Sequence, residues 1–244
     1  LAGGVSIDYF GHARSYLYMA ALPLVPVLLL AFTREVGRGP RVKSEEEQAV
    51  LSTSLLAIPA LRRTLIASAM AVTGQDLFQF YMPIYGHSVG LSASAIGMVL
   101  GMFGVSAFFV RVGLPVLVKR WGSDAVFNGS LYVSAVAFTL FPFFTSAVAL
   151  SLVALVCGLG MGCAQPVTLM LVFSRAPEGR SGEALGMRVT INQFTHIVVP
   201  ILFGSIGSVF GVAPVFAVNA LILAGGGWLN RERTASPMNA DERR

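Results

Sequence analysis

One carboxylate stands in the middle of an apolar stretch, where an ionised group is costly and invites a functional explanation. Asp76 lies within the run Thr73–Tyr81, and if this run is helical, Gln75 and Gln79 share a face with it. Asp76 can then take up a proton or act as counter-ion to a cationic ligand, while Gln75, Gln79 and Tyr81 hydrogen-bond that ligand. The alternative is that Asp76 pairs with a nearby Arg or Ser and holds two helices together.

A second polar group interrupts a later apolar stretch. It consists of Arg188, Asn192, Gln193, Thr195 and His196. At helical spacing Arg188, Asn192 and Thr195 fall on one face, and Gln193 and His196 fall on the adjoining one. Such a helix should face a partner or a cavity rather than lipid. His196 can titrate near neutral pH and relay protons, or it can make one structural hydrogen bond.

Two arginines lie inside apolar stretches, at different depths. Arg111 is about 12 Å along a helix from the basic turn at Lys119. Its long side chain can extend to lipid headgroups or make a structural pair, and the alternative is contact with a ligand. Arg188 is nearer to the end of its helix and close to Glu183, which favours a structural contact.

Three alternate glycines, Gly158, Gly160 and Gly162, precede Gln165 and Pro166. A nucleotide-binding fingerprint needs a strand before its glycines and a helix after them, whereas these residues all lie in one long apolar segment. We predict instead that the glycines let helices approach closely and that Pro166 permits a bend. Gln165 would then add a polar wall to a ligand path.

The sequence offers no arrangement typical of an enzyme or a metal centre. No cluster of His, Cys or carboxylates has metal-ligand spacing, and no Ser–His–acid set is suggested. Cys157 and Cys163 lie six residues apart in one predicted helix, too far apart for a disulfide. We therefore expect no catalytic residues, no metal and no cofactor.

Seven apolar segments run through the 244 residues, and most match the about 20 residues that a membrane helix needs. They are Tyr16–Phe32, Leu65–Ile84, Ile96–Val118, Ala125–Phe144, Ala147–Phe173, Val189–Phe210 and Ala213–Leu229. The chain is 55% hydrophobic and 12% charged, with a mean hydropathy of +0.73. A soluble protein with helices this apolar would need a larger core than this chain can supply. We predict an all-α integral membrane protein.

Lys and Arg are concentrated in alternate loops. The loop Thr33–Arg63, the turns that hold Lys119 and Arg175, and the tail after Leu229 are basic, whereas Gly86–Ala95 has no Lys or Arg. By the positive-inside rule the basic loops and the C-terminus are cytoplasmic, and we expect a multi-pass protein of a bacterial inner membrane. The net charge of +5 meets anionic lipid headgroups there and gives no argument for nucleic acid.

Four parts follow from this layout. The expected domains are 1–32, the end of one helix bundle; 33–63, a cytoplasmic linker; 64–230, a six-helix bundle; and 231–244, a cytoplasmic tail. Long polar linkers in membrane proteins usually join two bundles. Because the chain begins without Met and Leu1–Asp8 looks like the end of an earlier helix, we expect a fragment whose partner is a preceding N-terminal helix bundle.

Three local motifs accompany the layout: Leu1-Ala2-Gly3-Gly4, Lys119-Arg120-Trp121-Gly122, and the turn Pro177–Gly186. Together they resemble the major facilitator superfamily, whose members look like two six-helix halves joined by a cytoplasmic linker. On this resemblance the segment Tyr16–Phe32 is helix six, and Leu65 to Leu229 supplies helices seven to twelve. Lys119 stands where the family has an acidic residue, and Asp124 close by could substitute for it.

The resemblance implies the C-terminal part of a twelve-helix, proton-coupled secondary transporter of small molecules that works by alternating access. The match at Leu1–Gly4 favours export. One rival is uptake of an organic acid or sugar, with Arg111 or Arg188 binding a carboxylate, and another is a membrane scaffold that transports nothing. The residues expected along the substrate and proton pathway are Asp76, Gln75, Gln79, Tyr81, Gln165, Asn192, Gln193, His196 and Arg111.

Overall fold

The structure is a computed structural model that describes residues 55–231, apart from the side chains of residues 206, 208–210 and 213. All of these residues belong to one compact unit of the chain. The expected segment Tyr16–Phe32, most of the linker and nearly all of the tail lie outside the described residues.

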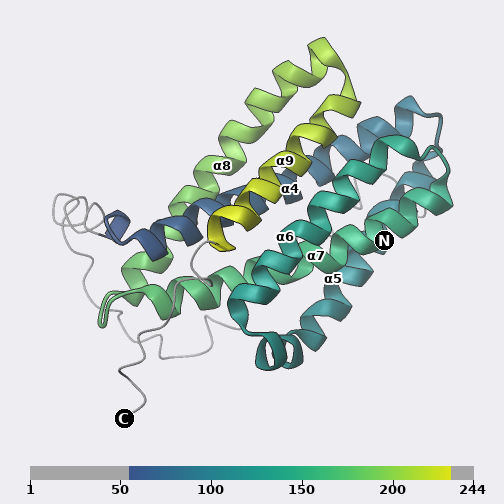
Figure 1. Ribbon diagram of the computed structural model, residues 1–244. Coiled ribbons are helices and arrows are strands. Elements are labelled where there is room, and N and C mark those ends of the chain that lie inside the picture. The colour runs from purple at the N-terminus through teal and green to yellow at the C-terminus, as the bar shows by residue number, and fades with distance from the viewer. Residues whose placement is uncertain (1–54, 232–244) are drawn as a thin grey trace, which may run out of the picture. The chain divides into compact units, whose positions relative to one another are not determined.

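Six long helices make up almost all of residues 55–231, and no strand occurs among them. They are α4 (Pro59–Ser88), α5 (Ala93–Trp121), α6 (Ser123–Leu140), α7 (Ala147–Arg175), α8 (Ser181–Phe210) and α9 (Val212–Arg231), with the 3₁₀ turn η1 (Phe141–Phe143) after α6 (Figure 1). Each of the last six apolar segments corresponds to one of these helices. The segment Ala125–Phe144 is not one continuous α-helix, because Pro142 has no N–H to donate and the chain tightens into η1.

Three of the described helices are long and apolar enough to cross a membrane by length and composition. They are α5, α6 together with η1, and α7, with mean hydropathies of 2.0, 1.4 and 2.2. In α4 the polar residues Gln75, Asp76 and Gln79 reduce the hydropathy at the centre of the helix. Seven complete spans and the twelve-helix arrangement therefore remain predictions.

The glycines of α7 determine how closely its neighbours approach. A Cβ on Gly158 would lie 2.4 Å from the carbonyl oxygen of Phe103 in α5, and one on Gly160 would lie 2.7 Å from the carbonyl oxygen of Ser130 in α6. α7 packs most extensively against these two helices and also contacts α4 and α8. The predicted role of the alternate glycines, close helix approach, is thus confirmed on two sides of α7.

Aromatic rings fill the core between α4, α6 and α9. Phe78, Phe138, Phe141 and Phe216 are all fully buried, and the ring centroid of Phe141 lies 5.5 to 5.7 Å from those of the other three. Burial of several rings in one place stabilises the helix packing. Phe78 therefore packs inside the bundle, whereas Phe80 on the same helix is exposed.

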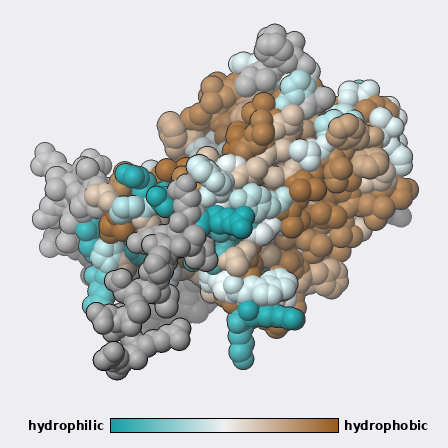
Figure 2. All heavy atoms as spheres, viewed as in Figure 1, coloured by the Kyte–Doolittle hydropathy of each residue, from teal (hydrophilic) through white to brown (hydrophobic). Residues whose placement is uncertain are grey.

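Large apolar side chains cover much of the outside of the bundle. α5 alone exposes Phe108, Phe109, Val112 and Val116 by 65% or more. Figure 2 shows hydrophobic residues over the upper and right-hand parts of the visible face, with the most hydrophilic residues toward the lower left. A contiguous apolar surface of this kind belongs against lipid or other helices, as expected for a membrane protein.

Replacing Gly160 by Ala should destabilise the bundle by about 1–3 kcal/mol, because the new methyl group meets the backbone of α6. The matched control is Gly129→Ala in α6, whose Cβ would meet nothing within 4 Å. Thermal unfolding of the two variants in the same detergent measures the difference. Equal melting temperatures would contradict the close approach of α7 and α6.

Candidate functional site

Asp76 and His196 form a pair between α4 and α8. The Nδ1 atom of His196 lies 2.6 Å from a carboxylate oxygen of Asp76, a hydrogen-bond distance in which the tautomer decides which atom holds the proton. The side chain of Asp76 is 10% exposed, whereas that of His196 is 44% exposed. His196 is therefore the more accessible member of the pair.

Two further polar contacts fix the α4–α8 interface on either side of this pair. The Ser68 hydroxyl donates to the amide oxygen of Asn192 at 3.3 Å, and the Tyr81 hydroxyl donates to the backbone carbonyl of Phe203. The contacts advance in the same order along both helices, which shows that α4 and α8 run parallel. Asp76 and His196 thus lie between two hydrogen bonds that join α4 to α8.

The structure brings together only some of the residues predicted for one pathway. Asp76, Asn192 and His196 meet at the α4–α8 interface. Tyr81 is 7% exposed and its hydroxyl is already engaged with α8, so it ties helices together in this conformation. The remaining members of this polar face are Gln75, which is half-buried, and Gln79 and Gln193, which are exposed.

Arg111, Gln165 and Arg188 lie apart from that interface, around a cavity of about 430 Å³ between α5, α7 and α8. Arg188 is 7% exposed and its Nη2 donates to the side-chain oxygen of Gln165 at 2.6 Å and to the Thr168 hydroxyl at 2.9 Å. Arg111 is exposed, and its Nε donates to the carbonyl of Gly162 at 3.2 Å. Gln165 serves here as an acceptor for Arg188.

The expected proximity of Arg188 and Glu183 does not lead to a pair. Glu183 instead accepts two hydrogen bonds of 2.9 Å from Arg180, which precedes α8. This hydrogen bonding raises the pKa of Arg180. Arg180 lies one helical turn from Glu183 and pairs with it. Arg188 instead donates to residues of α7.

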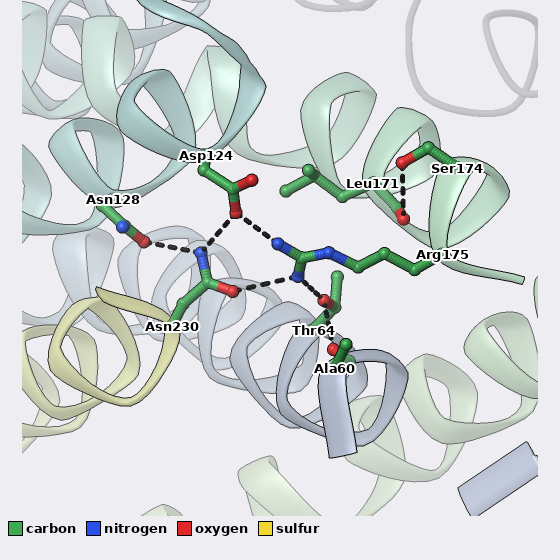
Figure 3. A network of polar contacts seen from close by, with 8 residues as sticks. All are labelled: Ala60, Thr64, Asp124, Asn128, Leu171, Ser174, Arg175 and Asn230. Carbon is green, nitrogen blue, oxygen red and sulfur yellow. Dashed lines mark hydrogen bonds and ion pairs between the residues drawn. The ribbon is translucent and has the colours of Figure 1, made fainter. Parts of the chain in front are cut away.

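A polar network joins four helices at the basic end of the bundle (Figure 3). Arg175 of α7 pairs with Asp124 of α6, donates to Thr64 of α4, and donates to the Asn230 side chain of α9 at 3.2 Å. Asn230 in turn donates to Asn128 at 2.7 Å. Asp124 is named among the sequence predictions, but Asn128 and Asn230 are not. Each of these is an amide side chain in a largely apolar helix, and that contrast could have identified them.

Among residues 55–231, no group of three or more His, Cys, Asp or Glu side chains could hold a metal ion. Cys157 and Cys163 are both buried and unbonded to each other. The described side chains do include a carboxylate and an imidazole within hydrogen-bond distance, Asp76 and His196. They also include the arginines and the amide at the cavity between α5, α7 and α8, groups that can form hydrogen bonds with a ligand.

The long apolar helices with paired polar groups between them define a multi-pass helical membrane protein. Comparison with known families makes the class specific: the family described as Major Facilitator Superfamily matches residues 1–200, and the chain belongs to it. Members of this superfamily are multi-pass membrane proteins.

Two curated relatives are similar over most of the chain. An uncharacterized MFS-type transporter, YuxJ, from Bacillus subtilis is 24% identical over 237 residues, covering 93% of this chain and 59% of the relative. The multidrug resistance protein MdtG from Citrobacter koseri is 23% identical over 225 residues, covering 90% of this chain and 55% of the relative. The chain thus spans less than two thirds of the length of either relative.

Arg175→Gln should destabilise the bundle, because it leaves Asp124 without its cation and removes the donor to Thr64 and Asn230. A double-mutant cycle with Asp124→Asn should give a coupling free energy of about 0.5–3 kcal/mol from unfolding in detergent. The control is Arg120→Gln, which changes an exposed arginine of α5 and should shift stability by about 0.5 kcal/mol or less. Additive effects of the two network substitutions would refute the pairing.

Proposed function

We propose that this chain is part of a secondary transporter that moves a small molecule across a membrane in exchange for protons. The family and the printed names of both relatives support transport. The observation that carries the proton coupling is the 2.6 Å contact between Asp76 and His196. Alternating access with a site near the bilayer midplane is the mechanism that fits such a fold.

The pair exchanges one proton with a large electrostatic consequence. Without the proton, the carboxylate and a neutral imidazole together carry one negative charge. With it, the pair is neutral overall, either as imidazolium and carboxylate or as imidazole and carboxylic acid. Because net charge in an apolar bundle is costly, the protonation state biases which arrangement of α4 and α8 is favoured.

Depth supports this assignment. Asp76 is 17 residues from the start of α4 and 12 from its end. It therefore lies roughly 25 Å from the first end of the helix and roughly 18 Å from the second. His196 lies at a similar position along α8. The exposed imidazole can then pass a proton between the buried carboxylate and its surroundings, as a proton relay does.

Export is the direction that we propose, because one relative carries the printed name of a multidrug resistance protein. Uptake of an organic acid is the second candidate, and it is favoured by one observation, the arginine-lined cavity between α5, α7 and α8. In either case the working protein includes a further helix bundle, consistent with coverage of 59% and 55% of the relatives. We place it in a bacterial inner membrane with the basic loops and the C-terminus in the cytoplasm.

Asp76→Asn should abolish transport driven by a pH gradient while substrate binding is retained, because the amide keeps the shape of the carboxylate but cannot exchange a proton. His196→Gln should slow gradient-driven transport by about a hundredfold, the scale of one proton-transfer group. The assay is uptake into proteoliposomes of the full-length protein across a panel of cations, anions and sugars.

Glu178→Gln is the matched control, since it neutralises an exposed carboxylate in the turn between α7 and α8. It should transport at the wild-type rate. Unchanged gradient-driven transport by Asp76→Asn would overturn the coupling assignment and leave Asp76 a structural residue. No transport of any panel member by the wild type would favour the scaffold instead.

Membrane orientation is testable with single introduced cysteines, because the native Cys157 and Cys163 are buried. A membrane-impermeant maleimide should label His87→Cys, at the end of α4, from outside intact cells. It should label Glu178→Cys only after the membrane is opened. The reverse pattern would contradict the orientation derived from the basic loops.

A further inference from the structure

The cavity between α5, α7 and α8 is lined by two arginines. Arg111 and Arg188 both line it, together with Leu114, Gln165, Pro166 and Leu169. Within residues 55–231 the ion pairs are Arg175 with Asp124, Arg180 with Glu183 and His196 with Asp76, so neither cavity arginine pairs with a carboxylate there. No salt bridge within the described part of the chain therefore accounts for the two guanidinium groups at this cavity.

Arg188 is also short of hydrogen-bond acceptors. Among residues 55–231 its hydrogen bonds all come from Nη2, which donates to the backbone and side-chain oxygens of Gln165 and to the Thr168 hydroxyl. Its Nε is buried with no partner in the described part of the chain. A guanidinium presents five N–H donors, and three neutral oxygens around one nitrogen leave part of this set unmet.

Burying a cation without a counter-ion is costly, and an unpaired buried donor adds to that cost. The residue is nevertheless 93% buried, at the 7% exposure noted above. Arg111 on the facing helix adds a second positive charge but is exposed. A ligand in this cavity would therefore meet one buried guanidinium, that of Arg188, and one accessible guanidinium, that of Arg111.

We propose that Arg111 and Arg188 bind one oxyanionic group, a carboxylate or a phosphate, in this cavity. The planar fork of a guanidinium matches the paired oxygens of both groups. The apolar side chains of Leu114, Pro166 and Leu169 in the same lining suit a hydrocarbon part attached to the anion. The ligand class is thus an amphiphilic organic anion, supplied either from solution or as the headgroup of an anionic lipid.

The site is separate from the proton pair. Arg188 precedes His196 by eight residues in α8, about 12 Å along the helix. Binding of the anion stands by itself, whereas its identification as the transported substrate rests on the proposed function. A binding measurement and a transport measurement can therefore fail independently.

The test is binding to the purified full-length protein in nanodiscs of phosphatidylcholine. Inorganic phosphate and citrate are titrated at constant ionic strength and followed by calorimetry, and phosphatidylglycerol is tested by adding it to the nanodiscs. Wild type should bind at least one of these saturably, and Arg111→Gln should weaken that binding by about tenfold or more. Arg188→Gln should do the same where its melting temperature shows that it is folded.

Two controls separate the outcomes. Arg120→Gln, an exposed arginine outside the cavity, and Glu178→Gln, an exposed carboxylate outside it, should both bind within about twofold of wild type. Binding of citrate or phosphate but not of phosphatidylglycerol identifies a dissolved anion, and the opposite result identifies a lipid headgroup. No saturable binding of any of the three, or equal affinity in Arg111→Gln and wild type, would overturn the proposal.

Discussion

The free-energy cost of a charge inside an apolar bundle is the constraint on which this structure depends. Three solutions to it occur among the described residues. Asp76 is satisfied by His196, Asp124 and Arg175 by each other and by Asn230, and Arg188 only by neutral oxygens. The contact between Asp76 and His196 can differ between protonation states, whereas Asp124 and Arg175 form an ordinary ion pair. Arg188 keeps a buried Nε with no partner among residues 55–231.

Helix packing allows these solutions to exist at defined places. Gly158 and Gly160 let α7 lie against α5 and α6 with backbone in close contact, and small residues at such interfaces are a common means of membrane-helix association. α7 then presents Gln165 and Thr168 toward Arg188 of α8. The same helix ends at Arg175, which joins it to α4, α6 and α9. Close packing of one helix thus supports both the cavity and the basic-end network.

The sequence predicted the helices well and the contacts poorly. Long apolar runs bounded by polar turns locate a helix without any knowledge of its neighbours, and six of the predicted segments coincide with helices. Asp76 and His196 were each selected as polar residues in apolar surroundings, but their pairing across 120 positions depends on the parallel packing of α4 and α8. The hydrogen bond from Tyr81, predicted as a ligand contact, to the carbonyl of Phe203 depends on the same packing and has no signal in the sequence.

The carboxyl group of Asp76 is the decisive place to measure proton coupling. Infrared difference spectroscopy of the wild type and Asp76→Asn, across the pH range in which histidine titrates, reports whether this group gains a proton. We expect a protonation signal that is lost in Asp76→Asn and moves to a different pH in His196→Gln. A carboxyl group that keeps one protonation state throughout, with His196 titrating independently of it, would contradict the assignment of this pair as the proton-coupling site.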